Sequence, residues 1–202
     1  MPSTASCRSG IRHAPVAGLD RLIAWFDLFR GLTLRVKDPR GEMTAAFEAA
    51  DVADDAYHDG KDADAAIREL TRLKGDPFFM ALGFHKPHLP FNAPKRYWDM
   101  YDPEKLALAP FQKKAKNDAG WGYHNFGELR MYTPIPVSGP LDKTTQRNMI
   151  HGYLACVTYV DSLFGQILEK LEALEIADDT IAIIWGDHGW TWVITVFGAS
   201  TR

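Results

Sequence analysis

The chain has 202 residues, of which 46% are hydrophobic and 24% are charged, and its formal net charge is −3. This composition is typical of one globular domain, and the charge gives no reason to expect a nucleic acid or an anionic membrane as a partner. We recognise no signal peptide and no apolar run near the ~20 residues that cross a bilayer.

The first third of the chain contains two segments in which apolar residues recur at helical spacing. Residues 19–29 have apolar side chains at intervals of three and four, which predicts a short amphipathic helix. Residues 47–60 predict a loop rich in carboxylates, of which residues 54–60 are expected to be solvated. Residues 61–75 place alanine, isoleucine and leucine on one face of a second helix, and Gly75 is suited to its C-terminal cap.

A continuous apolar run of strand length occupies residues 77–84, which predicts a strand covered on both faces of a sheet. The three prolines Pro87, Pro90 and Pro94 follow and force an extended, irregular loop. Residues 102–140 have many glycines, prolines and aromatics, and we expect a long excursion over the surface rather than a regular element.

The last part of the chain predicts a long helix followed by a strand. Apolar residues recur at threes and fours across residues 143–174, with Asp142 or Thr144 as a possible cap. The apolar residues 181–185 then predict a second buried strand. A helix, a turn, a buried strand and a polar loop in this order indicate an α/β fold.

Polar clusters directly follow both predicted strands. His85-Lys86-Pro87-His88 follows the first strand, and Asp187-His188 follows the second. If the strands are parallel neighbours, both clusters lie at the same edge of the sheet, where ligands of α/β proteins gather. The sequence therefore predicts a site at this edge.

The residue types in the two clusters suit a metal ion and an oxyanion. Asp187 is a hard oxygen ligand for Ca²⁺ or Mg²⁺, and His188 can ligate a metal or donate to an anion. Lys86 and His88 can donate hydrogen bonds to an oxyanion. His85 is a poorer candidate, because alternation along an extended loop turns it away from Lys86 and His88.

Each cluster also has a plain structural interpretation. Gly-Asp-His-Gly is a weak signal that also fits a strand-end turn with a solvated aspartate. A proline-rich surface loop often carries incidental basic residues. The two cysteines, Cys7 and Cys156, form no C-x-x-C pair, and Cys156 is expected to pack as an inert core residue. Cys7 has no neighbour that would make it a nucleophile.

The combination of motifs is more specific than its parts. "DPFFMALGFHKPHLPFNAPKRYWDMYDPEKLALAPF" followed by "HGYLACVTYVDSLFGQILEKLEALEIADDTIAIIWGDHGW" resembles the sulfatase family, in the branch that includes iduronate-2-sulfatase. The resemblance covers residues 44–190 and implies an alkaline-phosphatase-like α/β/α sandwich with a mixed, mostly parallel sheet, here incomplete. It implies hydrolysis of a sulfate ester, with a sulfated carbohydrate as a candidate partner and neither a nucleic acid nor a membrane.

The resemblance also implies roles for individual residues. The family binds a divalent cation, usually calcium, and Asp187 and His188 match its metal-binding positions. His88 matches a catalytic residue that contacts the sulfate or the leaving oxygen, and the adjacent Lys86 is carried over as a substrate contact. The nucleophile of the family is a formylglycine made from the cysteine of a C-x-P-S-R motif.

Some parts of the family pattern have no match. The 202 residues contain no C-x-P-S-R motif and no paired aspartates of the N-terminal metal site. Residues 1–43 and 191–202 are therefore predicted to be non-matching ends around a partial sulfatase domain, and the isolated chain is predicted to be inactive.

Other interpretations stay open. A related metal-dependent phosphatase or phosphodiesterase is one alternative. A non-catalytic glycan-binding remnant that uses the aromatic loop 121–132 is another. The localisation is unknown: a cytoplasmic protein is the literal interpretation, and a chain without its original start would look the same, while the family is often exported, lysosomal or periplasmic.

Overall fold

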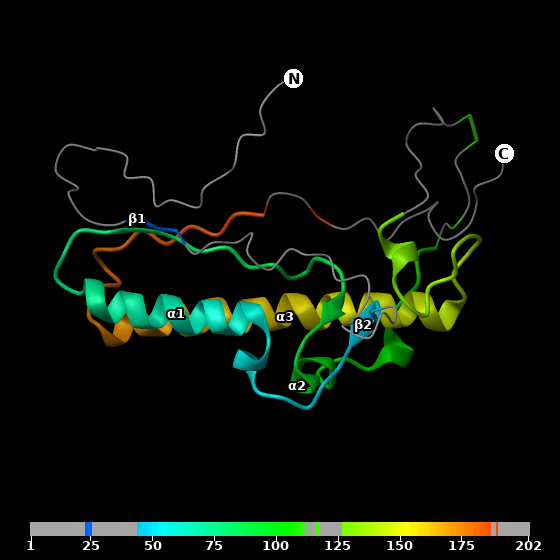
Figure 1. The fold of residues 1–202 in the computed structure, drawn as a ribbon, viewed down its shortest axis with the longest axis horizontal. Helices are drawn as coiled ribbons and strands as arrows, with labels where there is room; N and C mark the ends of the chain where they lie inside the picture. Colours follow the sequence, from blue (N-terminus) through cyan, green and yellow to red (C-terminus); the bar gives the residue numbers. More distant parts are fainter. Residues whose placement is uncertain are drawn as a thin grey trace, which may run out of the picture.

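Two long helices dominate the computed structural model, which describes residues 44–110, 112, 116–117, 127–186 and 189, and the backbone of Ile23–Trp25. Helix α1 spans His58–Leu73 and helix α3 spans Lys143–Ala173. The two helices contact each other and run in the same direction (Figure 1). Within the described residues, we find no helix that combines the length and the apolarity needed to cross a membrane.

Helix α1 confirms the helix predicted at residues 61–75, and it begins earlier, at His58. Its buried apolar face comprises Ala63, Ala66, Leu70 and Leu73. Gly75 has a φ of +94°, which glycine adopts without a steric penalty, so the chain leaves the helix where the sequence predicts. The earlier start includes Asp59, whose negative charge is favourable in the first turn of a helix.

Helix α3 confirms the long helix predicted at residues 143–174. Its N-cap is Asp142, whose side chain accepts a hydrogen bond from the Thr145 N–H at 2.8 Å. The face toward the core buries a row of side chains that includes Met149, Tyr159 and Leu163. Such a cap satisfies a backbone donor that the helix cannot pair internally.

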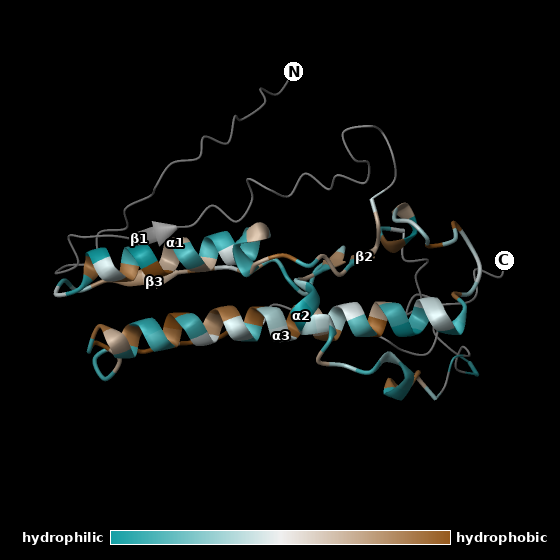
Figure 2. Ribbon diagram, turned by 90° about the horizontal axis from the view of Figure 1, so that it is seen from below, coloured by the Kyte–Doolittle hydropathy of each residue, from teal (hydrophilic) through white to brown (hydrophobic). Residues whose placement is uncertain are grey.

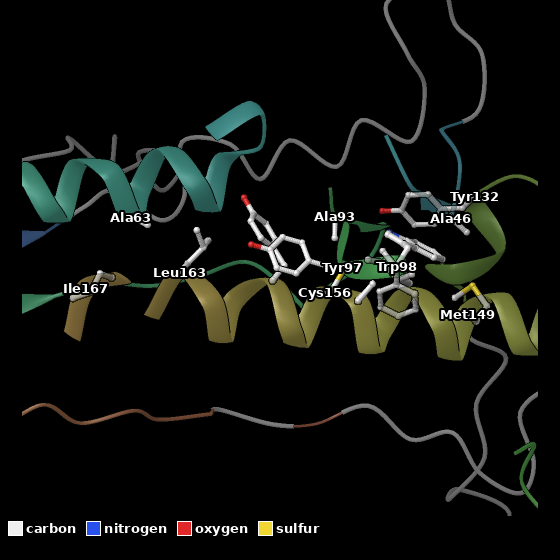
Figure 3. Packing of buried hydrophobic residues seen from close by; sticks show 14 of the residues in the cluster. Ala46, Ala63, Ala93, Tyr97, Trp98, Tyr132, Met149, Cys156, Leu163 and Ile167 are labelled. Carbon is white, nitrogen blue, oxygen red and sulfur yellow. The ribbon is translucent and has the colours of Figure 1, made fainter. Parts of the chain in front are cut away.

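The core lies where α1, α3 and three short elements meet. Strand β2 (Phe47–Glu48) pairs in parallel with strand β4 (Phe91–Asn92), and helix α2 (Lys95–Trp98) follows. Figure 3 shows side chains of these elements gathered along α3, from Ile167 to Met149. A contiguous cluster of this kind removes apolar area from water and is the main stabilising contribution to the fold.

A second parallel pair joins strand β1 (Ile23–Trp25) to strand β3 (Phe79–Ala81), with Ile23 opposite Phe79. The helix predicted across residues 19–29 is therefore wrong for Ile23–Trp25. Short apolar runs fit a helix face and a strand equally well, and here pairing with β3 decides the backbone conformation. The rest of that predicted helix lies outside the described residues.

The strand predicted at residues 77–84 is shorter and less covered than expected. Only Phe79–Ala81 are in strand conformation, and the Phe79 side chain is 56% exposed. The side chains at even-numbered positions of this segment are partly buried and pack against the core: Phe78, Met80, Leu82 and Phe84. The prediction of a strand buried on both faces is wrong here, because within the described residues only one face of β3 meets a packed layer.

The second buried strand, predicted at residues 181–185, is also not observed. Residues 181–186 have no regular structure, and Ile181 and Trp185 are each 88% exposed. A buried strand needs a hydrogen-bonded neighbour and covering side chains, and the described part of the chain supplies neither. The short irregular 3₁₀ turns at Pro103–Lys105 and Leu129–Met131 agree with the predicted excursion across residues 102–140. The whole is an incomplete α/β arrangement of helices with small parallel sheets, also visible in Figure 2.

Alkaline pH is expected to destabilise this core. Burial raises the pKa of the Cys156 thiol from 9.0 to about 12, and burial and Glu128 raise the pKa of Tyr132 to about 12. The folded state therefore prefers the neutral forms, while the unfolded chain loses these protons first. Stability from this source is complete below about pH 9 and is lost as the pH rises toward 12. Urea unfolding at pH 8, 9, 10 and 11 should show a falling free energy of unfolding; a constant value would contradict the expectation.

Candidate functional site

The His-Lys-Pro-His loop begins at His85, a short way after the end of β3 at Ala81, and is fixed at its start by helix α1. The His85 N–H donates to Oδ1 of Asp59 at 2.7 Å, and the Lys86 N–H donates to Oδ2 of the same carboxylate at 3.1 Å. Asp59 is 3% exposed. Both carboxylate oxygens are therefore occupied by backbone donors, and charge-assisted hydrogen bonds of this kind are stronger than neutral ones.

This contact corrects the prediction that residues 47–60 form a loop whose residues 54–60 are solvated. Phe47–Glu48 form β2, Asp59 is buried in α1, and the Asp54 carboxylate pairs with Arg96 and with the Tyr97 hydroxyl. The carboxylates of this segment thus hold elements together. The observed helix begins at His58, three residues before the predicted one, so the sequence pattern did not place Asp59 in a first turn.

The Lys86 side chain binds backbone carbonyl oxygens of its own loop. Its Nζ donates to the Pro90 carbonyl oxygen at 2.7 Å and to the His88 carbonyl oxygen at 3.3 Å. Burial lowers the pKa of Lys86. An ammonium has three N–H donors, so one remains beyond these two bonds. Lys86 therefore organises the loop, and its contact with a substrate stays a prediction.

His88 lies at the other end of the loop with its side chain 36% exposed. Its Nδ1 lies 2.8 Å from the Leu89 carbonyl oxygen, which can only accept, so Nδ1 carries a proton. Nε2 is then the ring nitrogen that is left to face a ligand. Glu128 lies beside the ring, with Oε1 3.7 Å from Nδ1.

His85 lies against His88 rather than away from it, which corrects the expectation from strand alternation. The two rings meet edge to face with centroids 5.7 Å apart, and the His88 N–H donates to the His85 carbonyl oxygen at 2.9 Å. The loop turns between the two residues, so the alternation of an extended strand does not apply. Burial, and then the charge of Lys86, lower the pKa of His85, which favours the neutral ring.

The predicted metal ligands Asp187 and His188 lie outside the described residues, so their distance from His88 stays a prediction. Among residues that the structure describes, no three side chains of His, Cys, Asp or Glu gather as a metal site. Each carboxylate oxygen of Asp59 accepts a backbone N–H of the loop. Beside the His88 ring lie the Glu128 carboxylate and the His85 ring, and the Lys86 ammonium binds carbonyl oxygens of the same loop. The aromatic loop 121–132 is described only from residue 127 onward, so its predicted role is also not tested.

The fold is alkaline-phosphatase-like. A solved structure of phosphonate monoester hydrolase SpPMH from Silicibacter pomeroyi is similar with a TM-score of 0.52 and 23% identity, covering 77% of this chain and 31% of that one. At this identity, the likeness supports the fold alone.

The family follows from the sequence comparisons. The Sulfatase family profile matches residues 15–191, and the chain belongs to the sulfatase family. The matched range includes β1. Human (Homo sapiens) iduronate 2-sulfatase is 31% identical over 170 residues, covering 78% of this chain and 31% of that protein. The Mus musculus protein of the same name is 33% identical over 152 residues, covering 71% and 27%. The chain thus spans about a third of the length of these relatives.

Proposed function

We propose that this chain provides the sulfate-contacting loop and part of the metal site of a hydrolase that removes sulfate from a carbohydrate ester. The observation that carries the proposal is the His-Lys-Pro-His loop, anchored on Asp59, with the half-exposed His88 at its end. A sulfatase family match across residues 15–191 supports the reaction class.

The loop would act by binding and orienting the sulfate group. Nδ1 of His88 is held by the Leu89 carbonyl oxygen, so the ring has a fixed orientation with Nε2 toward the ligand. A donor already in place stabilises developing charge without reorganisation during the reaction. As the protonated imidazolium, His88 would donate from Nε2 to a sulfate or leaving-group oxygen, and Lys86 would contribute its remaining N–H.

The metal site is assigned to Asp187 and His188. A carboxylate and an imidazole suit a divalent cation, and a calcium ion held there would supply positive charge to the sulfate oxygens. The formylglycine of the family does not fit this sequence, because no C-x-P-S-R motif is present in the 202 residues. The isolated polypeptide is therefore expected not to hydrolyse sulfate esters.

The substrate class is proposed from the relatives. Two are named iduronate 2-sulfatase, and a further relative from Formosa agariphila is named ulvan-active sulfatase, at 30% identity over 114 residues. These names describe those proteins. For this chain they favour a sulfated carbohydrate over other sulfate esters.

A chimera tests the proposal. Residues 44–190 would replace the matching segment of human iduronate 2-sulfatase, expressed in a host that makes formylglycine. We expect the folded chimera to hydrolyse a fluorogenic sulfated iduronide in the presence of calcium, while the isolated 202-residue polypeptide releases nothing. A chimera that melts cooperatively but hydrolyses no sulfate ester would contradict the proposed function. The expected inactivity of the isolated polypeptide would be contradicted if that polypeptide hydrolysed the substrate and lost this activity in His88→Ala.

A phosphorus ester is the second candidate. The multifunctional alkaline phosphatase superfamily protein PehA of Trinickia caryophylli is 33% identical over 135 residues, covering 60% of this chain. The chimera should therefore also receive p-nitrophenyl phosphate and phenylphosphonate esters. Faster hydrolysis of these than of the sulfated iduronide would favour the second candidate.

A further inference from the structure

We propose that Asp59 is a positioning residue of the sulfate site, and that it holds the His-Lys-Pro-His loop through its two hydrogen bonds to backbone N–H groups. This inference rests on the proposed function, since it assigns a role in sulfate binding to a residue that would not itself touch the sulfate. Asp59 lies 26 residues before His85, so neither the loop sequence nor its spacing points to it.

The first turn of α1, which contains Asp59, is held by several contacts. Asp59 lies in the first turn of α1, and α1 packs along α3. The neighbouring Gly60 allows the Asp54 carbonyl oxygen to come close to the helix, and the Tyr159 hydroxyl on α3 donates to that same oxygen at 2.7 Å. These contacts hold the first turn of α1, which carries Asp59, against the core.

The contact extends from Asp59 to His88 through three further interactions. The His85 carbonyl oxygen accepts the His88 N–H at 2.9 Å. The rings of His85 and His88 meet edge to face. Lys86 binds the carbonyl oxygen of His88 at 3.3 Å. Fixing the backbone of His85 and Lys86 therefore fixes both the main chain and the ring of His88.

The chemistry of the carboxylate suits this role. Two adjacent N–H donors need two acceptors, and a carboxylate supplies both with a charge. Burial lowers the pKa values of His85 and Lys86, and the negative charge of Asp59 offsets part of this effect. Asparagine has almost the same shape but only one acceptor oxygen, so Asp59→Asn would place its NH₂ group against one of the two N–H donors. That substitution tests the contact with little change in packing.

The experiment uses the ¹⁵N-labelled 202-residue polypeptide with calcium present and inorganic sulfate as the probe. In Asp59→Asn we expect amide hydrogen exchange at His85 and Lys86 to accelerate at least about tenfold, and sulfate to shift the His88 ring signals with about tenfold weaker affinity. The matched control is Asp55→Asn, which removes an exposed carboxylate next to the same helix and should change neither reading. The His151 ring on α3 serves as an internal reference that should not respond.

The outcomes separate this inference from the proposed function. Unchanged amide exchange and unchanged sulfate affinity of His88 in Asp59→Asn would overturn the role of Asp59 and leave the proposed function intact. The proposed function would be overturned if sulfate did not shift the His88 ring signals of the wild type while the amides of His85 and Lys86 were protected from hydrogen exchange. If Asp59→Asn fails to fold, scalar couplings across the hydrogen bonds of the wild type provide the test. We expect couplings between the amide nitrogens of His85 and Lys86 and the Asp59 carboxylate carbon. Their absence would overturn the inference.

Discussion

Replacing His88 with glutamine in the active chimera is expected to lower kcat/KM for the sulfated iduronide by a factor of roughly 100 or more. Glutamine keeps a polar side chain of similar length but cannot present a cationic, ring-fixed donor. His88 is half-exposed and makes one side-chain hydrogen bond to its own loop at 2.8 Å, so little of the fold depends on it. The melting temperature should therefore stay nearly constant while the rate falls.

The matched control is His151→Gln on α3. Nε2 of His151 bonds to the Trp98 carbonyl oxygen at 2.7 Å, and its ring lies against the Trp98 ring at 4.7 Å. We expect this variant to lower the melting temperature and to leave kcat/KM of the folded enzyme within about threefold. Equal losses of kcat/KM in the two variants would show that histidine at position 88 has no special part in catalysis.

Replacing Gly60 with alanine is expected to lower the free energy of unfolding by more than about 3 kcal/mol. A Cβ at this position would lie 2.0 Å from the Asp54 carbonyl oxygen and 2.8 Å from the Tyr159 hydroxyl. The first of these is a backbone atom, which cannot rotate away, so the start of α1 has to shift. Urea unfolding followed by circular dichroism measures the change, and exchange at His85 and Lys86 reports whether the loop loosens as well.

Gly165→Ala in α3 is the control, because among the described residues outside its own stretch of helix no atom lies within 4 Å of the added Cβ. Alanine is the better helix former by roughly 0.5–1 kcal/mol, so this variant should be as stable as the wild type or more stable. Comparable destabilisation by both substitutions would mean that the close approach at Gly60 is not what makes the difference.

The helices could be predicted because their information is local. Alanine and leucine at helical spacing, Gly75 after the last turn and Asp142 before the first turn of α3 act over a few residues, and all appear where expected. The strands could not, because a strand depends on partners elsewhere in the chain. The pairing of Ile23 with Phe79 is not visible in either segment alone, and the exposure of Ile181 depends on the absence of a neighbour within the described residues.

Of the candidate site, only the residues with a local sequence signal could be predicted. Lys86 and His88 were identified from their position after an apolar strand and from the family resemblance, and the structure places them in one ordered loop. Asp59 was taken for a solvated residue, since its partners are 26 and 27 positions away. Glu128 was missed as well, because its contact with His88 at 3.7 Å joins segments separated by 40 residues of chain.

We expect His88 and Asp187 to serve one shared ligand, and the ring signals of His88 test this most directly. Inorganic sulfate would be titrated into the 202-residue polypeptide with and without calcium, for the wild type and for Asp187→Asn. We predict a saturable shift of the His88 ring that needs calcium and disappears in Asp187→Asn, with His151 unaffected. A His88 response that is the same without calcium and in Asp187→Asn, or no response at any sulfate concentration, would contradict the account.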